Sequence, residues 1–145
     1  MNLNQSLRRI ITKNILLKTI LIIDDSMFDR LIATEVIKHR MPNNEIIALE
    51  SAEEALEYIN NTINTQSTIP DIIFLDIKMP KIDGFGFLER YEKFPSTITG
   101  LCRVYMLSSS IDPDDINKAM KSKHVYDFIE KPLTKEKIEK LFSNL

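Results

Sequence analysis

The sequence predicts an α/β fold, a doubly wound parallel sheet of five strands with helices on both faces. Five short aliphatic runs alternate with helix-like segments along the chain. The first run, Thr19 to Ile23, is apolar at nearly every position, which is typical of a strand buried on both faces. Strands that alternate with helices form right-handed β-α-β crossovers, and such crossovers build parallel sheets.

The other four strands are shorter aliphatic or β-branched runs bounded by turn residues. They are expected at residues 45–49, 72–75, 103–107 and 125–129. Asp76 follows directly on the third strand and ends it. The polar stretch 60–69 and the stretch 94–101, which contains a proline and a glycine, are expected to be loops.

Capping residues place the helices. A helix is expected from about Ser26 to Met41, because Pro42 disfavours helical geometry in the residue before it. Ser51 begins the next helix as part of a capping box with Glu54. Three further helices are expected over about 85–91, from Asp112-Pro113 onward and from Thr134 onward.

Length and composition favour one ordinary domain. The chain has 145 residues, 43% of them hydrophobic, and a net charge of −2, which gives no general attraction to nucleic acid or anionic lipid. A single cysteine, Cys102, excludes an internal disulfide and favours a reducing compartment. No apolar run approaches the roughly 20 residues of a membrane helix, and no signal peptide is evident, so we expect a cytoplasmic protein without a membrane span.

The chain is expected to divide into an N-terminal extension, residues 1–17, and a domain of residues 18–145. Leu3, Leu7, Ile10 and Ile11 fall at helical spacing among basic residues. A frayed tail or an extra packed turn is the simpler interpretation, and a membrane-surface or partner-binding helix is the alternative.

Polar residues gather where the predicted strands end. Asp24 and Asp25 follow the first strand, Asp76 ends the third, Ser108 follows the fourth and Lys131 follows the fifth. The carboxyl ends of parallel strands meet at one edge of the sheet, where ligands bind in doubly wound folds. Five separate segments therefore converge on one expected pocket.

The chemistry expected of this pocket is phosphoryl transfer. Three carboxylates in a partly desolvated cleft repel one another, and Mg²⁺, which prefers hard oxygen ligands, resolves the repulsion. Asp76 can then attack a phosphoryl donor. Lys131 adds a positive charge, and the Ser108 hydroxyl can donate to a phosphoryl oxygen, so the pocket offers the positioning and electrostatics that the reaction needs.

The ordered set of segments around these residues resembles the response-regulator receiver family of two-component systems. The matching segments are IIDDS at 22–26, LDIKMP at 75–80 with Asp83-Gly84, LSS at 107–109 and FIEKP at 128–132. The resemblance covers roughly Lys18 to Phe142. It implies a flavodoxin-like sheet of order 2-1-3-4-5, and a phosphorelay protein rather than an enzyme.

The resemblance also implies roles for single residues. Asp76 matches the aspartate that accepts a phosphoryl group from a sensor histidine kinase or a phosphotransfer protein. Asp25 matches the direct Mg²⁺ ligand, Asp24 an acidic neighbour that acts on the metal mostly through water, and the backbone carbonyl of Lys78 a further ligand.

Signalling residues follow from the same resemblance. Ser108 and Lys131 match the hydroxyl and the lysine that contact the phosphoryl group, and Phe128 matches an aromatic side chain that switches between two rotamers. Pro132 is expected to follow a cis peptide bond. The expected output is a downstream protein bound at the surface of the fourth helix, fifth strand and fifth helix, residues 112–142, because the chain ends soon after and no nucleic-acid contact is indicated.

Several alternatives stay open. Ser109 and Ser110 compete with Ser108 for the hydroxyl role, and Phe128 is alternatively an ordinary core residue. His39, His124 and Cys102 are interpreted as structural. The rival functions are a phosphate-independent interaction module and a phosphatase of the haloacid-dehalogenase type. The phosphatase needs a second acid two residues after its nucleophile, where this chain has Lys78.

Overall fold

The computed structural model describes residues 4–5, 18–65 and 68–143. Most of the expected N-terminal extension lies outside the described residues. In the part that the structure describes, no helix has the length and apolar character needed to cross a membrane.

Among the described residues, five strands alternate with helices as the sequence predicts, and one additional short helix, α5, follows α4. The strands are β1 (Thr19–Ile23), β2 (Glu45–Leu49), β3 (Ile72–Asp76), β4 (Arg103–Ser108) and β5 (Val125–Glu130). The helices are α2 (Met27–Arg40), α3 (Ala52–Asn64), α4 (Gly84–Tyr91), α5 (Ser96–Thr99), α6 (Pro113–Met120) and α7 (Lys135–Phe142).

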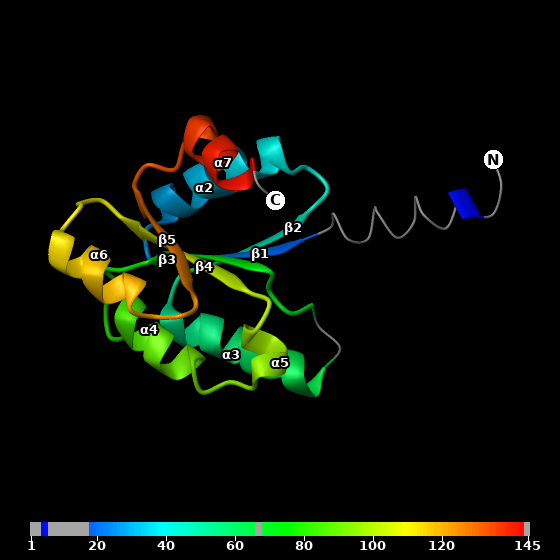
Figure 1. The fold of residues 1–145 in the computed structure, drawn as a ribbon, viewed down its shortest axis with the longest axis horizontal. Coiled ribbons are helices and arrows are strands. Elements are labelled where there is room, and N and C mark those ends of the chain that lie inside the picture. Colours follow the sequence, from blue (N-terminus) through cyan, green and yellow to red (C-terminus); the bar gives the residue numbers. More distant parts are fainter. Residues whose placement is uncertain (1–3, 6–17, 66–67, 144–145) are drawn as a thin grey trace.

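The strands form one parallel sheet in the order β2-β1-β3-β4-β5, which confirms the flavodoxin-like topology. The first strand, β1, lies inside the sheet, with β2 on one side and β3, β4 and β5 following in order on the other (Figure 1). Ile23 of β1 pairs with Leu75 of β3, and Asp76 pairs with Leu107 of β4. The segments that follow β1, β3 and β4 therefore leave the sheet side by side, at the switch point in strand order.

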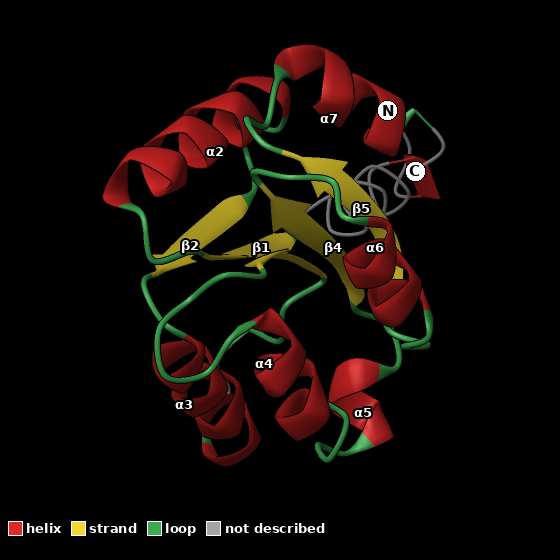
Figure 2. Ribbon diagram, turned by 90° about the vertical axis from the view of Figure 1, so that its left-hand side faces the viewer, coloured by secondary structure: helices red, strands yellow, loops and turns green. Residues whose placement is uncertain are grey.

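Helices cover both faces of the sheet, α2 and α7 on one face and α3 to α6 on the other (Figure 2). Side chains alternate between the two layers along each strand. Ile20 and Ile22 of β1 pack in the core under α2 and α7, whereas Leu21 and Ile23 join the core formed with α3 and α4. Buried side chains on both faces of the sheet pack against the helices, and this packing holds the carboxyl ends of the strands in fixed positions.

The prediction of a loop at 60–69 is wrong for its first residues, because α3 continues to Asn64. The buried stripe Ala52, Ala55 and Ile59 is extended by Thr62, which is 8% exposed. The Thr62 hydroxyl donates to the Ile59 carbonyl at 2.6 Å, so a polar residue fills a core position. A pattern of apolar residues alone does not show this last turn.

The prediction of a loop at 94–101 is also wrong in part, because this stretch contains the one-turn helix α5. Pro95 immediately precedes the turn, and the Gly100 amide donates to the Ser96 carbonyl at 2.8 Å. The two residues that suggested a loop thus bound a helical turn, which buries Ile98 and Thr99.

Candidate functional site

The turn from β1 into α2 directs Asp24 into the molecule. Asp24 is 1% exposed, and its Oδ1 accepts a hydrogen bond from the Ser26 amide at 2.9 Å. Ser26 caps α2 by accepting from the Asp29 amide at 3.2 Å. The capped helix starts immediately after the two acids, so Asp24 is held inside while Asp25 is exposed.

The last residue of β3, Asp76, is 4% exposed and lies next to the start of α4. The Gly84 amide donates to the Ile77 carbonyl at 2.8 Å. A Cβ atom on Gly84 would lie 2.6 Å from the Asp76 carbonyl oxygen, so this close approach requires glycine. The loop between them carries Lys78, which is exposed.

Three carboxylates converge at the switch point, and we call them the acidic cluster: Asp24, Asp25 and Asp76. One carboxylate oxygen from each lies within 4.8 Å of the others. A cluster of hard anionic oxygens this tight could hold a divalent cation.

Lys131, from the loop after β5, forms ion pairs with two members of this cluster. Its Nζ lies 2.7 Å from Asp24 Oδ2 and 3.1 Å from Asp76 Oδ1. Its backbone is fixed by a hydrogen bond from its amide to the Ser108 carbonyl at 2.7 Å, and the following bond to Pro132 is cis, as predicted. Burial lowers the pKa of Lys131, but its carboxylate partners outweigh burial and raise that pKa overall, so the ammonium stays charged.

Asp76 has a raised pKa of about 7. Burial is the largest cause, and the negative charge of Asp24 adds to it, while the charge and hydrogen bond of Lys131 act in the opposite direction. One ammonium therefore does not neutralise the cluster, and the excess negative charge favours an added cation.

The serine at the end of β4 is buried, whereas its two successors are exposed. Ser108 is 2% exposed, and its hydroxyl donates to the Ser110 carbonyl at 2.8 Å. Phe128 pairs with Met106 across β4 and β5 and is half-buried against the core. To reach a group on Asp76, the Ser108 hydroxyl would have to leave Ser110.

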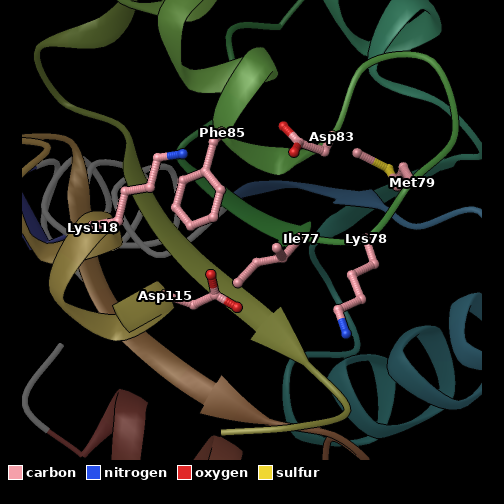
Figure 3. A pocket seen from close by; sticks show the side chains of 7 residues that line it. All are labelled: Ile77, Lys78, Met79, Asp83, Phe85, Asp115 and Lys118. Atoms are coloured by element: carbon pink, nitrogen blue, oxygen red, sulfur yellow. The ribbon is translucent and has the colours of Figure 1, made fainter. Parts of the chain in front are cut away.

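A hollow of about 570 Å³ separates the loop after β3 from α6. In Figure 3, Ile77, Lys78 and Met79 come from the loop, and Asp115 and Lys118 come from α6, with Lys118 extending toward Phe85. The Lys118 Nζ lies 4.4 Å from the centre of the Phe85 ring. The contact between the loop and α6 is thus incomplete at this point, which leaves room for side chains to rearrange.

Residue-by-residue interpretation missed Asp29 and Arg30. Asp29 Oδ2 lies 3.0 Å from the Lys131 Nζ, and Arg30 donates to the Asp24 carbonyl at 2.9 Å. Both lie in the first turn after the Ser26 cap. An acid three residues after a capping serine has the spacing of a capping box. The sequence around Asp29 therefore indicates a role in starting the helix and not a role in the site.

The residues interpreted as structural lie away from the acidic cluster or on the surface. His39 is exposed in the last turn of α2. His124 is buried against the Tyr91 ring at 5.3 Å between centres, and burial lowers its pKa. Cys102 is buried, and burial raises its pKa to about 12, so the thiol stays protonated.

Known proteins resemble this chain both in sequence and in fold. The family model of the response regulator receiver domain matches residues 20–143. Chemotaxis protein CheY of Listeria monocytogenes is 31% identical over 120 residues, covering 82% of this chain and 90% of that protein. A crystal structure of a two-component response regulator from Cytophaga hutchinsonii has a TM-score of 0.78 at 29% identity, covering 88% of this chain and 95% of the other. The Mn²⁺-bound form of response regulator Rcp1 has a TM-score of 0.68 at 27% identity, covering 86% and 88%.

The fold, the acidic cluster and the similarity to known proteins together define the class of this protein. It is a CheY-like receiver of two-component signalling. The chain belongs to the response regulator receiver domain family. An aspartyl phosphorylation site and a Mg²⁺ site are typical of this family, whose members are typically signalling modules and not enzymes. The chain spans 18% and 22% of the length of two protein-glutamate methylesterases that it also matches, so those relatives have additional domains.

Proposed function

We propose that this chain accepts a phosphoryl group on Asp76 from a sensor histidine kinase or a phosphotransfer protein, in a Mg²⁺-dependent reaction. The observation that carries the proposal is the position of Asp76: buried at a strand end, within reach of two further carboxylates and one lysine. We assign this function to a receiver domain of residues 18–145, acting in the cytoplasm.

The residues present fit a divalent cation. Asp25 is the exposed member of the acidic cluster and is proposed as the direct ligand, with Asp76 beside it. Asp24 acts mostly through water, because its carboxylate already accepts from Ser26 and pairs with Lys131. The backbone carbonyl of Lys78 supplies a further ligand. Bound Mg²⁺ would offset the charge of the cluster and of the incoming phosphoryl oxygens. That response regulator Rcp1, a structural neighbour, has a Mn²⁺-bound form supports the proposal of a divalent cation.

The chain's own groups perform the transfer by position and charge. An Asp76 carboxylate oxygen attacks the phosphorus of a phosphohistidine. The phosphorus–nitrogen bond breaks, and its electron pair returns to the imidazole of the donor, which takes up a proton. The ammonium of Lys131 and the hydroxyl of Ser108 donate to the transferred phosphoryl oxygens.

Two surfaces are proposed for partners. The donor is expected on the first turns of α2, where Met27, Phe28 and Leu31 expose apolar side chains next to Asp25. The downstream protein is expected at α6, β5 and α7. On the side of β5 that faces α7, a groove of about 510 Å³ is lined by aromatic and charged residues of β4, β5 and α7, among them Tyr126, Phe128 and Lys137.

The test is incubation with Mg²⁺ and acetyl phosphate, followed by intact mass and by measurement of released phosphate. A lasting gain of one phosphoryl group, lost when Mg²⁺ is removed by chelation, is the expected result. Continuous release of phosphate without an adduct would favour the phosphatase. No adduct and no turnover would favour the phosphate-independent interaction module.

Asp25→Ala is expected to weaken Mg²⁺ binding at least about tenfold, because it removes a proposed direct ligand. The same change reduces like-charge repulsion in the cluster, so the metal-free variant should be no less stable than wild type. Calorimetric titration with Mg²⁺ and thermal unfolding measure the two effects. Equal Mg²⁺ affinity in variant and wild type would refute the ligand assignment.

Ser108→Ala is expected to keep phosphorylation of Asp76 but to uncouple it from the surface of α6, β5 and α7. A charge-assisted hydrogen bond to the phosphoryl group would be worth roughly 1.5–3 kcal/mol, enough to draw the hydroxyl from Ser110 and to let Phe128 move. The measurement is NMR of that surface with and without beryllofluoride. Undiminished shifts around Phe128 in the variant would show that the hydroxyl is not the link.

A further inference from the structure

The ammonium of Lys131 has all of its donors in use. An ammonium group carries three N–H donors and no acceptor. Three carboxylate oxygens surround Nζ, from Asp24 at 2.7 Å, Asp29 at 3.0 Å and Asp76 at 3.1 Å. A phosphoryl oxygen can therefore gain a hydrogen bond from Lys131 only if one of these carboxylates gives up its place.

Asp29 is the partner that is lost at least cost. Its side chain is 34% exposed, compared with 2% for Asp24 and 6% for Asp76. A carboxylate that leaves an ion pair must be solvated again, and only an exposed one can turn to water for this. Asp24 is further held by the Ser26 amide, and Asp76 is the residue that carries the phosphoryl group.

The carboxylate of Asp29 is also not needed to start its helix. The Ser26 hydroxyl caps α2 by accepting from the Asp29 backbone amide, a bond that any residue except proline could donate at position 29. The acid at the same place in α3, Glu54, instead turns back to its own helix start and accepts from the Glu50 amide at 3.2 Å. Asp29 reaches across to Lys131, 102 residues along the chain.

We propose that Asp29 is a positioning residue that competes with the phosphoryl group for Lys131. In the unphosphorylated protein Asp29 occupies the third donor of the ammonium. When a phosphoryl group arrives on Asp76, one of its oxygens replaces Asp29, which turns to solvent. This inference rests on the function proposed above, since it assumes Asp76 as the acceptor. It assigns to Asp29 control over how tightly the site holds phosphoryl oxygens.

The test uses beryllofluoride, a non-covalent phosphoryl analogue, titrated into the full chain at saturating Mg²⁺ and followed by NMR. Asp29→Asn removes the competing charge with little change of shape. It should bind beryllofluoride about 2- to 5-fold more tightly than wild type, the range expected for loss of one partly exposed ion pair. Asp29→Glu, which restores the charge, should return the affinity toward that of wild type.

A spectroscopic signature separates competition from a general effect on folding. In wild type, the ¹³C signal of the Asp29 carboxylate should shift when beryllofluoride binds, because Asp29 loses Lys131. The control variant is Glu35→Gln, which removes one exposed charge from the same helix and should leave the affinity unchanged.

The outcomes distinguish this inference from the function on which it rests. Asp29→Asn that binds beryllofluoride no more tightly than wild type, with an unshifted Asp29 signal in wild type, would overturn the inference alone. Wild type that binds no beryllofluoride at any Mg²⁺ concentration would overturn the proposed function, and this inference with it.

Discussion

Lys131→Met is expected to destabilise the metal-free protein by about 3–5 kcal/mol at neutral pH or above, the cost typical of removing one partner from a buried ion pair. Its Nζ is the shared cation of Asp24, Asp29 and Asp76, all within 3.1 Å. Methionine keeps most of the volume of the buried stem but leaves these carboxylates facing one another. Chemical denaturation at several pH values measures the loss.

The expected loss depends on pH and on metal in a way that ordinary packing damage does not. At low pH Asp76 becomes protonated, so the loss should shrink. Saturating Mg²⁺ should likewise recover much of the stability, because it supplies positive charge to the same oxygens. Lys135→Met, which removes an exposed lysine at the start of α7, is the control and should change little. A loss that is equal at all pH values and insensitive to Mg²⁺ would contradict the electrostatic role of Lys131.

Asp76→Asn is expected to make the metal-free protein more stable than wild type at pH 8 and to remove a pH dependence. The Asp76 pKa is about 7 in the folded protein, raised from 3.8, mainly by burial and then by the charge of Asp24. The folded state therefore binds this proton more tightly than the unfolded state does. The stability that it contributes is fully present below about pH 4 and is lost as the pH rises through about 7.

The slope of this loss has an upper limit of about 1.4 kcal/mol per pH unit for a single group. Asparagine cannot titrate, so the variant should lack the part of the decline between pH 4 and pH 7 that Asp76 contributes. Glu57→Gln, a change of an exposed acid on α3, should retain the decline. Urea denaturation of the metal-free proteins across this range makes the comparison. If the stability of wild type and of Asp76→Asn changed with pH in parallel, ionisation of Asp76 would cost the folded protein no stability, and the prediction would be wrong.

Most of the sheet could be predicted because its strands are short aliphatic runs that end in polar residues. The run from Thr19 to Ile23 is almost wholly apolar, and the structure places it inside the sheet, between β2 and β3, with every residue buried. The places where prediction failed have a local physical cause. Thr62 is a polar residue that satisfies its own hydroxyl and so fills a core position in α3. Pro95 and Gly100 bound a helical turn as readily as they bound a loop.

The acidic cluster could be predicted because Asp24, Asp25 and Asp76 each follow a strand of one parallel sheet, and such ends meet. The part of Asp29 in the site could not be predicted, because its place in the sequence is that of an ordinary residue in the first turn of a helix. Only the packing of α2 beside the loop after β5 brings its carboxylate to Lys131. Contacts between residues 102 positions apart depend on the tertiary structure and leave no periodic signal.

The central claim is that Asp76 carries the phosphoryl group, and borohydride mapping tests it most directly. The protein is labelled with acetyl phosphate and Mg²⁺, reduced with borohydride, which converts an aspartyl phosphate to homoserine, and then digested for peptide mass analysis. We expect homoserine at position 76 in wild type, and neither adduct nor homoserine in Asp76→Asn. Homoserine at another aspartate in wild type, or equal labelling of Asp76→Asn, would contradict the assignment.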